Sequence, residues 1–270
     1  MLWIVLFLAF AAGVTALVCL AGGGVFLGIL SFLLAFLLAH VLYFAIFALL
    51  CRGTDLTREG AKRNRYAACC CKATTQILAI YGGLRPVLTG LDKLPAEGRF
   101  LFVCNHRSLF DPAMVMNYLA DYEISFISKP SNLQIPFVGT IGRAAGYLAI
   151  DRENDRAALK TILQAADYMK RDICSIGIYP EGTRSHTREL LPFHHGSFKT
   201  AQRAKVPLVI ACVHGTEKLK QGFFLRPHKA YLEILEVIPA QQVAAMSTLE
   251  LSEHSRALIQ ACLERTEGRA

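Results

Sequence analysis

The chain has 270 residues, enough for one large domain or two small ones, with 53% hydrophobic residues and a formal net charge of +8. It contains no glycine-rich nucleotide-binding loop, no H-E-x-x-H motif and no zinc-type Cys/His spacing, which excludes the site classes that these motifs identify. The basic excess is concentrated beside a long apolar segment and is not interleaved with aromatic residues, so we expect no nucleic-acid partner.

The first 51 residues contain no Asp, Glu, Lys or Arg. An uncharged apolar stretch of this length exceeds the roughly 20 residues that span a bilayer core. Three glycines at positions 22–24 divide it into two apolar arms. A cleaved signal peptide is the rival interpretation, but no basic residue precedes the apolar run. We expect residues 1–51 to form a helical hairpin in the membrane, either spanning it twice or entering one leaflet.

The next segment, residues 52–72, carries six basic residues and two acidic ones, a surplus of four within the net charge of +8. Basic residues that flank an apolar segment stay on the cytoplasmic side of a membrane. They also attract anionic lipid headgroups, although setting the topology is a sufficient role. We therefore expect residues 52–84 to be a basic, membrane-proximal helical segment. The remainder of the chain would lie on the cytoplasmic face, which is that of the inner membrane in a bacterium.

Cysteine usage points to a reducing compartment. The nine cysteines are odd in number and include no C-x-x-C pair, which does not suit a disulfide framework. Three of them are consecutive, at positions 69–71. Acylation and metal binding are alternatives for this triplet, but buried, inert thiols on a helix near the membrane are the favoured interpretation.

Beyond residue 72, short apolar runs alternate with helical patterns. The expected strands are residues 100–104, 124–128, 147–150, 173–179, 207–213 and 230–238. The expected helices are residues 113–122, 156–170, 196–205 and 248–267. Continuous apolar strands are typical of a sheet buried on both faces. The alternation predicts an α/β domain over residues 85–270, with a mixed, mostly parallel central sheet flanked by helices.

The stretch NHRSLFD, residues 105–111, follows the first expected strand of this pattern. Ligands usually bind at the carboxyl ends of strands in α/β sheets. A neutral imidazole of His106, held in one tautomer by Asp111, would be a competent general base. The structural alternative is a helix start, because Ser108 and Asp111 have capping-box spacing and Pro112 suits the first turn.

Two further polar clusters follow strands. The turn Pro180-Glu181-Gly182-Thr183-Arg184 combines a flexible backbone, a hydroxyl and a guanidinium, which together suit a phosphate; an ordinary polar turn with a Glu–Arg pair is the alternative. Lys129 and Arg152 each follow an apolar run. They either direct charge into the same crevice or are solvated strand ends.

Taken together, these clusters resemble the 1-acylglycerol-3-phosphate acyltransferase family, the glycerolipid acyltransferases with H-x-x-x-x-D and EGTR motifs. The family's first block appears as NHRSLFD. The second resembles KPSNLQIPFVGTIGRAAGYLAIDR, the third YPEGTRSHTRELLPFHHGSF and the fourth KVPLVIACV. Four blocks in the family's order, within about residues 85–240, are more specific than any one alone. The apolar N-terminal hairpin also fits the family's membrane anchor.

The resemblance implies that the attacking hydroxyl belongs to the substrate. His106 would deprotonate the 2-hydroxyl of a lysophosphatidate while Asp111 orients the imidazole, and the alkoxide would attack an acyl thioester to give phosphatidate. The residues implied to bind the phosphate and glycerol of the acceptor are Lys129, Arg152, Glu181, Gly182, Thr183 and Arg184. Two further residues, Asn105 and Pro207, would support the site.

The same resemblance implies the partners of the protein. They are lysophosphatidate, an acyl thioester and a bilayer that contains anionic lipids. No cofactor is expected beyond the acyl donor as co-substrate, which would be acyl-CoA or acyl-carrier-protein.

Two points leave alternatives open. His194 and His195 stand where relatives often carry lysines, and together with His186 they could bind a metal, but no acidic or thiolate partner is suitably spaced, so we expect no metal. The acceptor could instead be glycerol-3-phosphate, another lysophospholipid or a lyso-ornithine lipid. A catalytically silent lipid-binding or scaffold protein of the same fold is the alternative from another class.

Overall fold

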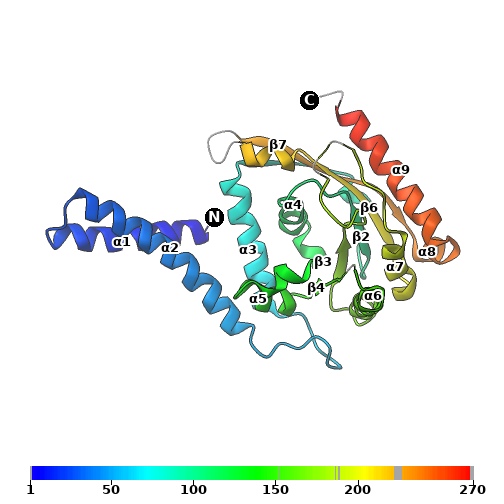
Figure 1. Cartoon of the computed structure of the whole chain (residues 1–270), viewed down its shortest axis with the longest axis horizontal. Coiled ribbons are helices and arrows are strands. Elements are labelled where there is room, and N and C mark those ends of the chain that lie inside the picture. The colour runs from blue at the N-terminus through cyan, green and yellow to red at the C-terminus, as the bar shows by residue number, and fades with distance from the viewer. Residues whose placement is uncertain (1, 152, 186, 188, 222–226, 268–270) are drawn as a thin grey trace.

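The N-terminal apolar segment forms two helices, α1 (Leu2–Leu20) and α2 (Val25–Leu50), which pair as a hairpin that projects from one side of the molecule (Figure 1). The computed structural model describes residues 2–151, 153–185, 187, 189–221 and 227–267, and the structural statements below concern these residues. The chain reverses at Gly22, whose φ of +85° is readily adopted only by glycine. Both helices are long and apolar enough to cross a membrane, and their most apolar windows are only 11% buried. The expected helical hairpin is confirmed, and its exposed apolar surface indicates membrane association.

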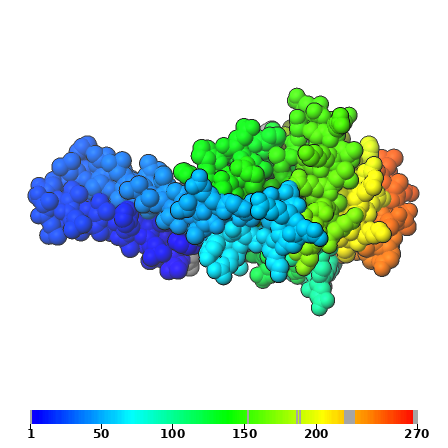
Figure 2. All heavy atoms as spheres, turned by 90° about the horizontal axis from the view of Figure 1, so that it is seen from below, coloured from blue at the N-terminus to red at the C-terminus, as the bar shows by residue number. Residues whose placement is uncertain are grey.

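The open end of the hairpin is attached to the rest of the protein. Trp3 and Phe7 of α1 form edge-to-face ring contacts with Tyr43 of α2, with centroids 5.0 and 5.6 Å apart. The hydroxyl of Tyr43 donates a hydrogen bond to the carbonyl of Cys70 in the next helix, α3 (Arg65–Tyr81). Figure 2 shows the hairpin extending beyond the body while the chain that follows it lies over the body. Large apolar side chains are nevertheless exposed at this attached end too, including Leu2 and Val5 of α1 and Leu49 of α2.

A seven-stranded sheet, in the order β1-β7-β6-β2-β5-β3-β4, forms the centre of the body. Its strands are β1 (Leu84–Thr89), β2 (Leu101–Cys104), β3 (Ile124–Ser128), β4 (Leu148–Ala149), β5 (Ser175–Ile178), β6 (Leu208–His214) and β7 (His228–Ile238). All neighbouring strands are parallel except β6 and β7, which are antiparallel. The expected mixed, mostly parallel sheet is confirmed.

Helices cover both faces of this sheet (Figure 1). They are α4 (Asp111–Tyr118), α5 (Val138–Ala144), α6 (Asp155–Lys170), α7 (Lys199–Ala204), α8 (Ala240–Ala245) and α9 (Thr248–Glu267). Successive strand residues point to opposite faces. Phe100 and Phe102 accordingly pack in the core on the α4 side, whereas Leu101 and Val103 pack in the core that contains α6, α7 and α9. All four side chains are fully buried, which explains why the sequence of β2 shows no alternation.

The expected elements are present with shifted ends. The run at 173–179 pairs only over Ser175–Ile178, and the expected helix 113–122 is α4 followed by a 3₁₀ turn at Ala120–Tyr122. Strand β1 was not expected, because its sequence LRPVLT contains a proline and its position at the edge of the sheet leaves three of its residues exposed. The helices α5 and α8 were also missed, since both are shorter than two full turns.

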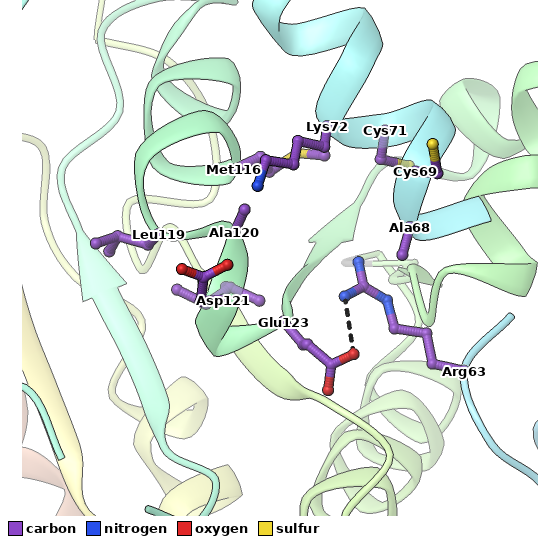
Figure 3. A pocket seen from close by; sticks show the side chains of 11 residues that line it. Arg63, Ala68, Cys69, Cys71, Lys72, Met116, Leu119, Ala120, Asp121 and Glu123 are labelled. Atoms are coloured by element: carbon purple, nitrogen blue, oxygen red, sulfur yellow. Dashed lines mark ion pairs between the residues drawn. The ribbon is translucent and has the colours of Figure 1, made fainter. Parts of the chain in front are cut away.

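The segment between hairpin and sheet packs on the body. Residues 52–64 form turns, and the helical part of the expected membrane-proximal segment is α3, which lies against α4. A cavity of about 210 Å³ lies between α3 and the turn after α4, and Figure 3 shows side chains that line it. At its edge, Nη1 of Arg63 lies 3.9 Å from Oε1 of Glu123, and Nε of Arg63 donates to the carbonyl of Ala145. These contacts attach the segment that follows the hairpin to the α/β body.

Candidate active site

The polar clusters expected at strand ends meet at one edge of the sheet. Strands β2, β5 and β6 are parallel neighbours, so their carboxyl ends lie side by side. His106 follows β2, Glu181 follows β5 and Thr216 follows β6. Parallel strands bring such loops together at the usual ligand-binding edge of an α/β sheet.

His106 and Asp111 form a hydrogen-bonded pair. Nδ1 of His106 lies 2.9 Å from Oδ2 of Asp111, whose side chain is fully buried, whereas the imidazole is 17% exposed. A carboxylate can only accept, so Nδ1 carries the hydrogen, and in the neutral imidazole Nε2 is then the nitrogen with the lone pair. The ring also stacks on Tyr179, with centroids 4.1 Å apart and an interplanar angle of 18°. The pair therefore presents a fixed imidazole with a basic nitrogen.

The carboxylate of Asp111 is held by three other groups. Oδ2 accepts from the backbone N–H groups of Arg107 and Ser108, each at 2.7 Å. Oδ1 accepts a short hydrogen bond from the hydroxyl of Thr216, which is fully buried. These bonds fix the position of the carboxylate independently of the imidazole.

The capping interpretation of the same stretch is wrong in one respect. Asp111 is the first residue of α4, and Phe110 occupies the N-cap position without a side-chain cap. The hydroxyl of Ser108 accepts from the N–H of Phe110 and donates to the carbonyl of Thr216. Of the capping box, only the bond from the N–H of Ser108 to the carboxylate of Asp111 forms, because that carboxylate is turned back toward His106. Pro112 does lie in the first turn, as expected.

Glu181 holds the loop that carries His106. Its two carboxylate oxygens accept from the N–H of His106, at 2.6 Å, and from the N–H of Leu191, at 2.9 Å. The side chain is buried, and this desolvation raises the pKa of Glu181 above its ordinary value. The structural alternative expected an ion pair between Glu181 and Arg184, but this carboxylate bonds to backbone N–H groups instead. A second link between the loops is the N–H of Ser185, which donates to the carbonyl of His106.

A cavity of about 390 Å³ opens beside His106. Of the residues expected to bind an acceptor, four line it: Lys129, Gly182, Thr183 and Arg184. Glu181 is not among its lining residues, because both of its oxygens are bonded to backbone. Arg152 lies outside the residues that the structure describes, as does His186.

The two supporting residues lie in different places. Oδ1 and Nδ2 of Asn105 pair with the N–H and the carbonyl of Val213, at 2.9 and 2.8 Å, and join the ends of β2 and β6 at the site. Pro207 precedes β6, whose seven residues separate it from the site by about 20 Å at the usual rise per residue. The carbonyl of Pro207 accepts from the N–H of Leu101. Pro207 therefore helps to start the sheet and does not contact the site.

Sequence reasoning missed the far wall of the cavity. Phe44 of α2 and Cys70, Cys71 and Thr74 of α3 line it, opposite the strand ends. Burial raises the pKa of Cys71 to about 12, and all nine cysteines are free. Of the three thiols that were expected to be buried and unreactive, Cys70 is buried, Cys71 is half-buried and Cys69 is exposed, and Cys70 and Cys71 form part of the cavity wall. Among the described residues, no three His, Cys, Asp or Glu side chains lie close enough to hold a metal ion.

Tyr179 and Thr216 were also missed. Tyr179 ends the expected strand 173–179 and directly precedes the turn that begins at Pro180, so its position was a usable signal. Thr216 stands 105 residues after Asp111, and no local pattern links the two.

Comparison with known proteins connects this geometry to a family. The Acyltransferase family model matches residues 85–214. The 1-acyl-sn-glycerol-3-phosphate acyltransferase of Salmonella typhimurium is 32% identical over 188 residues, which cover 67% of this chain and 76% of that protein. The Escherichia coli protein of the same name is 32% identical over 163 residues, covering 60% and 66% of the two chains.

A solved structure has the same fold. The crystal structure of the 1-acyl-sn-glycerophosphate (LPA) acyltransferase PlsC from Thermotoga maritima is similar with a TM-score of 0.63 and 24% identity. The match covers 85% of this chain and 95% of that chain. On the sequence relationships and the shared fold together, the chain belongs to the acyltransferase family that includes the 1-acyl-sn-glycerol-3-phosphate acyltransferases.

Proposed function

We propose that the protein transfers a fatty acyl group from an acyl thioester to the 2-hydroxyl of 1-acylglycerol-3-phosphate and so makes phosphatidate. The observation that carries this proposal is the His106–Asp111 pair beside a cavity that combines Arg184 and Lys129 with an apolar wall. The names of the relatives support the choice of acceptor and of reaction. The acyl donor is a co-substrate, and the reaction needs no further cofactor.

The chemistry follows from the fixed imidazole. Nε2 of His106 takes the proton of the 2-hydroxyl, and the alkoxide oxygen attacks the thioester carbonyl. The tetrahedral intermediate then collapses: its C–S bond breaks, and the thiolate takes the proton from the imidazolium. Asp111 stabilises the imidazolium between these two transfers. The attacking hydroxyl arrives with the lipid, so no serine nucleophile and no acyl-enzyme are required.

The cavity suits an amphipathic acceptor. Arg184, Lys129 and Thr183 provide two cations and a hydroxyl for the phosphate, while Phe44 and Ile141 belong to its apolar side. Since Phe44 belongs to the membrane hairpin, the apolar side lies next to the bilayer from which a lysolipid would enter. The acyl chain of the donor could also use this apolar side, so the preference for lysophosphatidate over glycerol-3-phosphate rests on the names of the relatives.

We expect Arg184→Ala to raise the KM for lysophosphatidate about 10- to 100-fold, the loss that corresponds to one hydrogen bond to a charged group. The kcat should change much less. Arg184 lines the acceptor cavity, and within the described part of the chain it forms no hydrogen bond to the imidazole of His106. Initial rates at saturating donor measure both constants. Arg203→Ala, an exposed change on α7, is the matched control. An unchanged KM in Arg184→Ala would remove this residue from the phosphate site.

Glu181→Ala should mainly lower kcat, whereas Arg184→Ala should mainly raise the KM for the acceptor. It leaves the N–H groups of His106 and Leu191 without their acceptor, which costs about 1–3 kcal/mol of unfolding free energy for each buried group. We expect a lower kcat with a nearly constant KM for the acceptor, because the His106 loop loses its anchor. Denaturant unfolding and steady-state kinetics test this. A large rise in KM with unchanged stability would instead make Glu181 a substrate ligand.

We also propose that the body faces the cytoplasm and rests on anionic lipids. Five of the six basic residues in 52–72 are exposed: Arg52, Arg58, Lys62, Arg65 and Lys72. In a Cys19→Ser background, a membrane-impermeant maleimide should label the exposed Cys69 only after sealed, right-side-out vesicles are permeabilised. Labelling in the sealed vesicles would place the body on the other side.

The decisive assay offers the purified protein a panel of lyso-acceptors with acyl-CoA and with acyl-carrier-protein, followed by lipid mass spectrometry. We expect phosphatidate from lysophosphatidate as the main product. Preferential acylation of another acceptor would redirect the proposal, and no product with any pair would support a catalytically silent homologue.

A further inference from the structure

The imidazole of His106 belongs to a stack of three aromatic rings. Its centroid lies 4.1 Å from that of Tyr179, and the two rings are inclined by 18°. The ring of Tyr179 also stacks with that of Phe126, with centroids 5.1 Å apart and an angle of 9°. Such separations are typical of offset-stacked aromatic pairs. Proton transfer uses the hydrogen bond between His106 and Asp111, whereas the stack has no role assigned to it.

Two adjacent strands build this stack. Phe126 lies on β3 and is the register partner of Gly177 on β5. A Cβ atom at Gly177 would lie only 2.5 Å from Cε1 of Phe126, so the ring of Phe126 packs directly against the backbone of β5. Tyr179 follows Gly177 by two residues, and its side chain shares a buried core with Phe126 on the same face of the sheet. The absence of a side chain at Gly177 therefore lets Phe126 lie beside Tyr179.

Both supporting rings are held inside the protein. Phe126 is 2% exposed and Tyr179 is 8% exposed. Burial raises the pKa of Tyr179 well above its ordinary value, so its phenol stays protonated and uncharged. Buried side chains in a close-packed interior occupy defined rotamers. The imidazole of His106 thus rests on a rigid, neutral aromatic surface.

A hydrogen bond at one ring atom does not fix the plane of an imidazole. The χ2 torsion of histidine has a broad energy profile, so the ring of His106 could tilt while Nδ1 keeps its bond to Asp111. Such a tilt would move Nε2, the nitrogen that takes the proton of the acceptor hydroxyl. Stacking on Tyr179 sets the plane that the hydrogen bond leaves open. The two contacts together direct the lone pair of Nε2.

The stack also suits the charged form of the ring. An imidazolium exists between the two proton transfers, and a cation over the face of an aromatic ring is attracted by the electrons of that face. The separation of 4.1 Å between the rings of His106 and Tyr179 is within the range of this interaction. Tyr179 contacts the face of the imidazolium, whereas Asp111 binds its edge.

We propose that Tyr179, supported by Phe126 and Gly177, is a positioning residue that sets the plane of the His106 imidazole for acyl transfer. This inference rests on the proposed function, in which His106 is the general base. Tyr179 acts through His106 and takes no proton itself.

The kinetic test compares Tyr179→Leu with Tyr179→Phe in the full-length protein. Tyr179→Leu removes the flat ring, and we expect kcat to fall about 10- to 100-fold, since a misplacement of about 1 Å can cost about 10²-fold. The KM for each substrate should change much less than kcat. Tyr179→Phe keeps the ring and should retain nearly the full kcat. Phe126→Leu should cause a smaller loss than Tyr179→Leu, because Phe126 supports the ring of Tyr179 without touching the imidazole.

Tyr168→Leu is the matched packing control. Tyr168 is 4% exposed and packs in the core on the other face of the sheet. This variant should lose unfolding free energy, as Tyr179→Leu does, but keep its kcat. An equal loss of kcat in Tyr168→Leu would reduce Tyr179 to a general packing role. A loss in Tyr179→Phe as large as that in Tyr179→Leu would assign the effect to the hydroxyl, and either result overturns the proposal.

A second measurement does not depend on acyl transfer. Diethyl pyrocarbonate modifies the unprotonated nitrogen of an accessible imidazole, and peptide mass spectrometry gives the rate at each histidine. The side chain of His106 is 17% exposed, and Tyr179 covers one face of its ring. We expect Tyr179→Leu to be modified faster at His106 and Tyr179→Phe to match the wild type. His254, which is 41% exposed, provides the internal reference rate.

The two measurements separate this proposal from the proposed function. Faster modification of His106 in Tyr179→Leu, in a protein that acylates no lysophosphatidate, would reject the proposed function and support the stack. An unchanged modification rate together with a wild-type kcat in Tyr179→Leu would show that Asp111 alone holds the imidazole, and would overturn the positioning role of Tyr179.

Discussion

Replacing His106 with alanine is expected to lower kcat for acyl transfer by about 10²–10⁴-fold, the contribution of a positioned general base. The fold should survive, because the bonds that hold this loop are made by the backbone N–H and carbonyl of residue 106, to Glu181 and Ser185. Initial rates with saturating acceptor and donor give kcat, while circular dichroism and membrane fractionation report on folding and attachment.

The chain offers a matched control for this experiment. His254 and Glu236 form another imidazole–carboxylate pair, with Nε2 and Oε2 2.9 Å apart, but both side chains are 41% exposed. His254→Ala should leave kcat unchanged, since this pair does not line the cavity beside His106. Near-normal turnover in His106→Ala would reject the general-base role.

Two changes at Asp111 should separate charge from geometry. Asp111→Ala removes the acceptor for the imidazole, for two backbone N–H groups and for the hydroxyl of Thr216. We expect kcat to fall by up to about 10⁴-fold, as when the histidine of a Ser-His-Asp triad is no longer held in the correct tautomer. We also expect a loss of about 1–3 kcal/mol of unfolding free energy for each buried group left unsatisfied.

Asp111→Asn should be less severe than Asp111→Ala. The N–H groups of Arg107 and Ser108 both point at Oδ2, so the amide oxygen of asparagine must take that position. Nδ1 of His106 then still donates to an oxygen and the tautomer is kept, but the negative charge that stabilises the imidazolium is lost. Unfolding curves and kcat for both variants check this order. Equal kcat values for Asn and Ala would show that the charge, rather than the held tautomer, accounts for the whole effect.

Much of the fold could be predicted because its signals are local. The uncharged run before Arg52 and its glycine break predicted the hairpin, and buried apolar runs separated by helical patterns predicted the α/β sheet. The pairing of His106 with Asp111 was also predictable, since the two residues are five positions apart within one loop. Strand β1 escaped because an edge strand with Pro86 has no strong apolar signal.

The sequence alone determined the class of the fold, the apolar hairpin and the pairing of His106 with Asp111, because each depends on residues that are neighbours in the chain. Only the tertiary structure decided where the side chains point and which segments that are far apart in the sequence come into contact. It turned Glu181 inward to the backbone of His106, placed Pro207 at the far end of β6 and brought Thr216 to Asp111. It also placed Phe44 of the hairpin in the wall of the cavity beside His106. Packing between distant segments fixes such contacts, and no spacing along the chain encodes them.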